Sequence, residues 1–423
     1  MNILVIGSGG REHTLVWKLT QSPKVNKIYC APGNAGIASL AECIDIGVED
    51  INQLVLFAKV NNIDLTIVGP EVPLTMGITD VFEAEGLKVF GPDKNCAQLE
   101  GSKAFTKEFL INHNIPTAEY KEVNSFEEAK KEIGIYGYPM VIKADGLAAG
   151  KGVVIAEDEE TANKAFEEMM ADKIFGDAGD KVVIEEFLTG IEASVLCFVD
   201  GETIVPMASA QDYKKIFEND EGPNTGGMGT YSPSAIYNEE LENRIENEIL
   251  QPVIRGFKKD KLDFKGILFI GIMIKDNKPK VIEFNVRFGD PEAQSVLTRL
   301  DTDLIDIMES IIAKDLKNQE IKWDNKKTTT VVLSSGGYPG PYEKGKVITG
   351  LDTVDEDVVV FHAGTKFEGK DIVTNGGRVL GVTAWGNTPE EAKAKAYKNV
   401  AKISFEGAYY RKDIGAKAEK YLK

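Results

Sequence analysis

Four short apolar runs recur through the first hundred residues, and segments with helical spacing such as 51–59 separate them. The runs lie at 3–6, 27–30, 65–68 and 87–90. Short uninterrupted apolar runs are typical of strands that are buried on both faces, and helices join such strands in parallel sheets. We therefore expect residues 1–100 to form a doubly wound α/β domain.

A different pattern begins at Ser125, which forms a capping box with Glu128 and so starts a helix. Three apolar strands are expected nearby, at 139–142, 153–156 and 182–186. These elements predict a small helix-on-sheet unit, residues 121–190, within a second domain that spans 101–327. We expect the small unit to move as a lid.

Two longer apolar runs, 266–274 and 280–288, flank the turn sequence 275–279 and predict a β-hairpin. The last segment, 328–423, contains β-rich runs and then Thr388, a good N-cap that is followed by proline at the first helical position. We expect this segment to be a β-rich third domain. The predicted fold class is therefore α/β and α+β, multidomain.

The charge limits the classes of ligand. Lys and Arg number 49 against 67 Asp and Glu, so the formal net charge is −18. Such a chain gains nothing from the counterion release that drives nucleic-acid binding. The sequence has no apolar run of about 18 residues for a membrane span, and its first residues do not resemble a signal peptide. We expect a cytoplasmic protein that binds neither nucleic acid nor membrane.

Cysteine and histidine are sparse. The cysteines have no metal-binding or redox spacing and are expected to be unpaired, buried residues in a reducing compartment; they are Cys30, Cys43, Cys96 and Cys197. The 3 histidines lie far apart in the sequence. This pattern disfavours a zinc site and a histidine-based catalytic triad.

The turn after the first strand, residues 7–12, is rich in glycine and opens a helix. Its backbone N–H groups suit a phosphate, although a tight turn without any ligand explains the pattern equally well. A dinucleotide fingerprint would have glycine in place of Glu12 and an acid at the end of the second strand, so nicotinamide binding is disfavoured. Glu71 follows another expected strand and is placed to hold an amine or ribose hydroxyls, unless it is plain solvated surface.

The run 141–155 is the most specific local signal. It is not a P-loop, because only three residues separate Gly146 from Gly150 and a strand follows instead of a helix. Together with Gly152, these glycines let the backbone approach phosphate oxygens. Lys143 at the strand end and Lys151 in the loop can meet phosphate charge. A flexible hairpin without a ligand is the alternative.

An acidic pair, Glu185 and Glu186, is followed directly by Phe187 and Leu188. The pattern suits a hinge beside a flat ligand, where backbone groups read adenine and Glu192 takes ribose hydroxyls. Without the neighbouring glycine loop, the same residues would indicate only a buried strand.

Period-two alternation along 280–288 puts Glu283, Asn285 and Arg287 on one face. The other face takes the apolar residues Ile282, Phe284, Val286 and Phe288. Glu and Asn oxygens suit Mg²⁺, and the arginine can clamp a carboxylate or phosphate. An ordinary half-exposed strand is the alternative, but it explains Asn285 poorly because asparagine is a weak strand former. Upstream, Asp212 can bind an ammonium.

Short motifs occur in a fixed order along nearly the whole chain, at 7–13, 31–36, 68–71, 101–105, 143–152, 223–229, 283–292 and 375–380. As a set they resemble the phosphoribosylamine–glycine ligases, a family of ATP-grasp enzymes in de novo purine synthesis. The resemblance implies an N-terminal α/β domain, an ATP-grasp core with a mobile lid, and a C-terminal domain that helps to close the site. It also implies ATP, Mg²⁺ or Mn²⁺, glycine and phosphoribosylamine as ligands of a monomer.

The resemblance also assigns residues. ATP is implied near Lys103, Lys143, Gly146, Gly150, Lys151, Gly152, Glu185, Glu186, Phe187, Leu188 and Glu192. The metal is implied at Glu283 and Asn285. Phosphoribosylamine is implied near Gly9, Gly10, Glu12, Asn34 and Glu71, and glycine near Asp212 and Arg287. Catalytic roles are implied for Lys143, Asp212 and Arg287. Many ATP-grasp enzymes carry another metal carboxylate on the preceding strand, where this chain has Ile270, Gly271 and Ile272.

The implied reaction passes through glycyl phosphate and needs no protein nucleophile. Three other functions remain open from the sequence. A carboxylase or formate-using purine ligase of the same superfamily would share the nucleotide loop but not the region 211–229. A dehydrogenase is disfavoured because Glu12 stands where a dinucleotide fingerprint would have glycine. A nucleotide-binding sensor without catalysis is disfavoured by the intact set Glu283, Asn285 and Arg287.

Overall fold

The computed structural model describes residues 1–147 and 152–416. Its N-terminal part is a parallel sheet in the order β3-β2-β1-β4-β5. The strands are β1 (Asn2–Gly7), β2 (Lys27–Pro32), β3 (Glu42–Cys43), β4 (Leu65–Val68) and β5 (Val89–Phe90). The helices of this part are α1 (Gly10–Leu19), α2 (Ile51–Val60), α3 (Glu71–Met76), α4 (Ile78–Ala84) and α5 (Lys94–Gly101). The predicted doubly wound arrangement is confirmed, and β5 is shorter than expected because the Leu87 N–H closes α4 by donating to Phe82 O.

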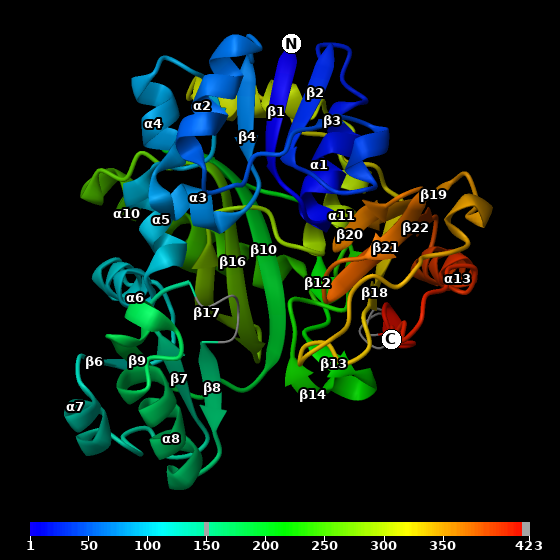
Figure 1. Ribbon diagram of the computed structural model, residues 1–423. Helices are drawn as coiled ribbons and strands as arrows, with labels where there is room; N and C mark the ends of the chain where they lie inside the picture. Colours follow the sequence, from blue (N-terminus) through cyan, green and yellow to red (C-terminus); the bar gives the residue numbers. More distant parts are fainter. Residues whose placement is uncertain (148–151, 417–423) are drawn as a thin grey trace.

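A second, antiparallel sheet in the order β6-β9-β7-β8 projects from the rest of the molecule (Figure 1). Its strands are β6 (Tyr120–Val123), β7 (Met140–Ala144), β8 (Val153–Ala156) and β9 (Val182–Glu186), and its helices are α7 (Phe126–Lys131) and α8 (Glu159–Phe166). Ser125 Oγ accepts the Glu128 N–H at 3.2 Å, so the predicted N-cap is confirmed. Because Ile142, Phe166 and their neighbours form a separate hydrophobic cluster, this unit has its own core.

The central sheet has the order β11-β10-β16-β17 and is antiparallel. Its strands are β10 (Ile191–Asp200), β11 (Ile204–Pro206), β16 (Lys265–Lys275) and β17 (Lys278–Asn285). The helices of the same region are α6 (Lys103–Asn112), α9 (Glu239–Arg244), α10 (Gln251–Asp260) and α12 (Leu304–Ile312). The predicted hairpin 266–288 is present, although its second strand already ends at Asn285.

A β-bulge interrupts the alternation that we predicted for 280–288. Gly271 of β16 faces Glu283, whereas the next residue, Ile272, faces Val281, so Ile282 is the extra residue in β17. A bulge opposes two residues to one and shifts the side-chain alternation. Val281 is therefore buried in the core, and Ile282 lies on the same side as Glu283, where we had expected an apolar face turned away.

The C-terminal sheet has the order β12-β15-β18-β22-β19. Its strands are β12 (Gln211–Asp212), β15 (Gly229–Ser232), β18 (Lys327–Ser334), β19 (Val358–His362) and β22 (Arg378–Gly386). Two small hairpins and two helices accompany it: β13 (Lys215–Phe217) with β14 (Glu221–Asn224), β20 (Thr365–Glu368) with β21 (Asp371–Thr374), α11 (Glu292–Val296) and α13 (Pro389–Val400). Thr388 caps α13 as predicted. The segment after 328 does not build this sheet alone, since β12 and β15 come from the middle of the chain.

Buried polar groups join the N-terminal and C-terminal sheets, which lie side by side in Figure 1. His13 Nδ1 accepts the His362 N–H at 2.7 Å, and both side chains are buried. Asn34 Nδ2 donates to Ser8 O and His362 O, each at 2.8 Å. Burial lowers the pKa of His13 to about 3, with His362 adding to the shift, and burial lowers the pKa of His362 to about 4. Both rings are therefore neutral at pH 7.

This histidine pair predicts acid sensitivity. The folded-state pKa of His13 lies below its ordinary value of 6.5, so the unfolded chain takes up the proton first. The contribution to stability is complete above pH 6.5 and falls as the pH drops toward 3. By pH 5 the loss should be about 2 kcal/mol per histidine. Urea unfolding between pH 7.5 and 5 should show a smaller decrease for His13→Gln than for the parent; equal decreases would contradict the prediction.

The described cysteines are all free thiols, and Cys43 is the one that is only partly buried. Among residues 1–147 and 152–416, no helix has the length and apolarity that crossing a bilayer would require.

Candidate active site

A cavity of about 540 Å³ lies where the β6-β9-β7-β8 sheet, the central sheet and loops of the two terminal sheets meet. It gathers most of the residues that the motifs indicated. Those that line it are Glu71, Lys103, Lys143, Gly146, Gly152, Glu185, Glu186, Phe187, Leu188, Glu192, Glu283, Asn285 and Arg287. Gly150 and Lys151 lie outside the described residues.

A buried acid between two lysines lies on the side of the cavity formed by β7 and β9. Lys143 Nζ lies 2.8 Å from Glu185 Oε1, and Lys107 Nζ lies 3.0 Å from Glu185 Oε2. All three side chains are buried, but only Lys143 and Glu185 line the cavity. Burial lowers the pKa of Lys107 to about 8, against the opposing effect of Glu185. Lys107 was missed from the sequence because nothing in the helical spacing of α6 distinguishes it.

The opposite wall carries the oxygen donors of β17. Asn285 Nδ2 lies 3.4 Å from Glu283 Oε1, and Lys103 Nζ lies 3.6 Å from Glu283 Oε2. Burial alone would raise the pKa of Glu283, but Lys103 and two further lysines lower it to about 2. Glu283 is therefore a carboxylate at neutral pH, and with the Asn285 oxygen it fits a hard divalent cation.

The preceding strand offers no side-chain ligand at this point, because Gly271 faces Glu283 there. Within the described part of the chain, no cluster of three or more His, Cys, Asp or Glu side chains could enclose a metal ion. A cation at Glu283 and Asn285 would therefore take its remaining ligands from water and phosphate oxygens, as Mg²⁺ commonly does.

Arg287 is held by carboxylates from two elements. Its Nε lies 3.2 Å from Glu71 Oε2, and its Nη2 lies 2.9 Å from Glu100 Oε1. Glu100 also accepts the Val286 N–H at 2.7 Å, which ties α5 to the end of β17. Burial would raise the pKa of Glu71, but Arg287 and Arg11 lower it. The guanidinium is thus fixed in orientation against the cavity.

Asp212 lies behind the cavity wall. Its side chain is buried, it does not line the cavity, and its Oδ2 lies 2.7 Å from Lys214 Nζ. The ammonium that Asp212 meets in this structure is therefore that of Lys214. Lys214 itself lines the cavity, 3.9 Å from Glu292 Oε1.

Protein carboxylates accept two backbone N–H groups at the glycine turn before α1. The Gly9 N–H donates to Glu12 Oε2 at 2.6 Å, and the Arg11 N–H donates to Asp290 Oδ2 at 3.2 Å. Two protein carboxylates therefore accept N–H groups at the helix N-terminus that we had considered for a phosphate. Of the residues that the resemblance places near phosphoribosylamine, four do not line this cavity, and their assignment stays a prediction: Gly9, Gly10, Glu12 and Asn34.

Glycine at position 69 makes room for Glu12. A Cβ atom at Gly69 would lie 2.2 Å from Glu12 Oε1. We expect Gly69→Ala to lower the free energy of unfolding by about 2 kcal/mol, because the buried carboxylate cannot move away freely. Urea denaturation would measure the loss. Gly47→Ala is the matched control, since its Cβ would have no described heavy atom within 4 Å; equal losses in both variants would contradict the packing role.

Several cavity residues were not assigned from the sequence: Arg11, Glu100, Lys214, Asp290, Glu292 and Arg378. Most of them lie inside the motifs quoted above, so the neighbouring motif residues could have indicated them from the sequence. Arg378 comes from the C-terminal sheet, and its Nη1 donates to Gly226 O at 2.7 Å and to Asp290 O at 2.5 Å. It thereby closes the cavity from the side of that sheet. Glu100 lies outside these motifs, so the sequence did not indicate it.

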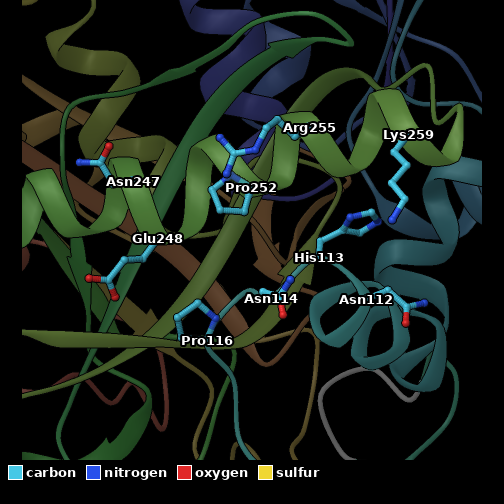
Figure 2. A pocket seen from close by; sticks show the side chains of 9 residues that line it. All are labelled: Asn112, His113, Asn114, Pro116, Asn247, Glu248, Pro252, Arg255 and Lys259. Atoms are coloured by element: carbon cyan, nitrogen blue, oxygen red, sulfur yellow. The ribbon is translucent and has the colours of Figure 1, made fainter.

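A second cavity, of about 520 Å³, lies elsewhere, at the end of α6 beside α10 (Figure 2). It is lined by Asn112, His113, Asn114, Pro116, Asn247, Glu248, Pro252, Arg255 and Lys259. Its imidazole is already engaged, since His113 Nε2 lies 2.7 Å from Asp260. This cavity shares no residue with the cavity described above.

Comparisons with known proteins find the same family along nearly the whole chain. Family profiles of phosphoribosylglycinamide synthetase match residues 1–100 (N domain), 101–293 (ATP-grasp (A) domain) and 328–417 (C domain). A phosphoribosylamine–glycine ligase of Caldanaerobacter subterraneus is 51% identical over 98% of this chain and 100% of its own. One of Halalkalibacterium halodurans is 52% identical over 99% and 97%.

Solved structures show the same likeness. A phosphoribosylamine–glycine ligase from Thermotoga maritima has a TM-score of 0.84 and 33% identity, covering 98% of this chain and 100% of that one. A biotin carboxylase domain from Hydrogenobacter thermophilus, at 15% identity, has a TM-score of 0.74 over 97% and 91% and shares the fold. The fold class and the ligase class predicted from the motifs are confirmed. The chain belongs to the phosphoribosylglycinamide synthetase family.

Proposed function

We propose that this cavity joins glycine to phosphoribosylamine at the expense of ATP, giving glycinamide ribonucleotide, ADP and phosphate. Relatives that match nearly the whole chain are named for this ligation. The observation that carries the proposal is that Lys143 of the lid and Glu283 of the central sheet line one cavity. A triphosphate needs both a fixed cation and a metal seat, so it can be held between these two walls.

ATP would lie against the lid. The segment from Glu185 to Leu188, which begins in β9 and continues past its end, lines the cavity together with Gly146 and Gly152; this suits a base held by backbone groups and a nearby apolar side chain. Lys103 and Lys143 supply positive charge for the phosphates. We further propose that residues 121–190 close over the nucleotide as a unit, because this unit has its own core and contributes one wall of the cavity.

Glu283 and Asn285 would hold the divalent cation, either Mg²⁺ or Mn²⁺. A bound divalent cation neutralises phosphate charge and shares phosphate oxygens. The chain's own part is to keep Glu283 ionised and to orient the amide oxygen of Asn285, which Arg287 Nη2 contacts at 3.2 Å. Activity restored after chelation by each cation in turn would show which is used.

The first step would join glycine to phosphate. The glycine carboxylate attacks the γ-phosphorus, the bond to the β-phosphate oxygen breaks, and ADP leaves, giving glycyl phosphate. Arg287, fixed by Glu71 and Glu100, is placed to orient the carboxylate. A closed lid protects the acyl phosphate from water.

The second step would use the amine of phosphoribosylamine. Its nitrogen attacks the acyl carbon, and phosphate leaves with the bonding electrons. No serine, cysteine or histidine nucleophile is required, in keeping with a cavity that is lined by acids, lysines and arginines.

One assay tests the proposed function. The purified chain should release ADP only when glycine, phosphoribosylamine and a divalent cation are all present. Bicarbonate or formate in place of glycine should give no ADP release above background. Turnover with either of these substrates, and none with glycine, would assign the chain to another branch of the ATP-grasp enzymes and refute the proposal.

A further inference from the structure

Glu292 is a buried acid without a full set of partners. It opens α11, its side chain is only 2% exposed, and it lines the cavity. Its Oε1 atom accepts no hydrogen bond from any described residue. A buried carboxylate oxygen that lacks a donor is costly, so its retention in a cavity wall calls for an explanation.

The charges around Glu292 do not neutralise it. Lys214, its nearest described cation, is 3.9 Å from Oε1 and pairs instead with Asp212 at 2.7 Å. The charge of Glu292 also acts on Arg287 and Arg378 and raises the pKa of each guanidinium. Burial, followed by the charge of Asp212, raises the pKa of Glu292 to about 7, while Lys214 and Arg287 oppose the shift. The group is poised to exchange a proton near neutral pH.

The backbone around Glu292 is shaped for this position. A Cβ atom at Gly289 would lie 2.3 Å from Glu292 Oε2, so only glycine leaves room for the carboxylate. Glu292 also interacts electrostatically with Arg287, the group that we assign to the glycine carboxylate. Glu292 and Arg287 thus line one cavity, in which the acyl group would form.

We propose that Glu292 is the general base of the second step and takes the proton from the attacking amine of phosphoribosylamine. The inference rests on the proposed function. The nitrogen–carbon bond forms, the bond between the acyl carbon and the phosphate oxygen breaks, and phosphate leaves with that electron pair. The amine nitrogen loses one proton on becoming an amide, and the carboxylate of Glu292 receives it. No oxidant or further reactant is needed.

Hydroxylamine separates the two steps. It is a small, strong nucleophile that intercepts glycyl phosphate as glycine hydroxamate, so ADP release with glycine and hydroxylamine reports the first step. For Glu292→Gln we expect turnover with phosphoribosylamine to fall by about 10²- to 10³-fold. The hydroxylamine-supported rate and the KM of glycine should change by less than about threefold. Turnover of Glu292→Asp should be roughly tenfold higher than that of Glu292→Gln, because aspartate restores a carboxylate.

The pH profile gives an independent readout. The ratio of the phosphoribosylamine rate to the hydroxylamine rate should rise with pH and level off above about 7 in the parent enzyme. Glu292→Gln should abolish this rise. Asp200→Asn is the matched control: Asp200 is also a buried acid, and it accepts the N–H groups of Glu202, Thr203 and Leu316 away from the cavity. It should lower the melting temperature and leave the ratio and its pH dependence intact.

Two outcomes would overturn the assignment. A large rise in the KM of glycine, together with loss of the hydroxylamine rate in Glu292→Gln, would mean that Glu292 binds the glycine ammonium. An unchanged ratio and pH profile would mean that the carboxylate is structural. If the parent enzyme forms neither hydroxamate nor product from glycine, the proposed function itself fails.

Discussion

Replacing Glu283 with alanine is expected to lower kcat by about 10³-fold, or roughly 4 kcal/mol of transition-state stabilisation. The substitution removes the ionised member of the two oxygen donors on β17 and leaves Asn285 alone opposite Lys103. Steady-state ADP release should show the loss, and the concentration of Mg²⁺ needed for half-maximal activation should rise.

The fold of this variant should persist, because the Glu283 side chain is about one-third exposed and lies at the cavity wall. Glu42→Ala provides the matched control, since Glu42 is also an acid paired with a lysine, Lys27 at 2.7 Å. Its turnover should equal that of the parent. Unaltered turnover and metal dependence in Glu283→Ala would refute the metal assignment.

Replacing Lys143 with methionine should lower kcat/KM for ATP by about 10²- to 10³-fold. Methionine keeps most of the side-chain volume but removes the charge that faces the cavity. Glu185 retains its second partner, since Lys107 Nζ is 3.0 Å from Oε2. The loss of stability should therefore be smaller than for a buried acid left entirely unpaired.

Lys107→Met is the control that the structure supplies. Both lysines contact the same carboxylate, but Lys107 does not line the cavity. We expect Lys107→Met to affect the melting temperature more than the KM of ATP, and Lys143→Met to show the reverse order. The same KM and kcat in Lys143→Met as in the parent would remove Lys143 from the nucleotide site.

Local patterns predicted a good part of the fold. The apolar runs of β1, β2 and β4, the N-caps Ser125 and Thr388 and the hairpin of β16 with β17 are each encoded within a few neighbouring residues. The same applies to much of the cavity, because many of the residues that line it come from two short stretches of sequence: Lys143, Gly146 and Gly152 from one, and Glu283, Asn285 and Arg287 from the other.

Contacts between distant segments could not be predicted from local sequence patterns. The pairing of β15 with β18 joins residues about a hundred positions apart and puts part of the middle of the chain into the C-terminal sheet. The bulge at Ile282 depends on how β16 meets β17, so alternation along one strand could not reveal it. Nothing in the order of residues shows that Glu12 lies against Gly69 while its carboxylate accepts the Gly9 N–H.

By itself the sequence determined the family, the ligase chemistry and the identity of most charged groups in the cavity, because these follow from motifs whose residues are close in the chain. Only the tertiary structure decided which charges neutralise one another. Lys214 pairs with Asp212, Lys107 shares Glu185 with Lys143, and one oxygen of Glu292 has no hydrogen-bond donor among residues 1–147 and 152–416. Electrostatic energy depends on the distance between charges and on their burial, and the order of residues along the chain gives neither.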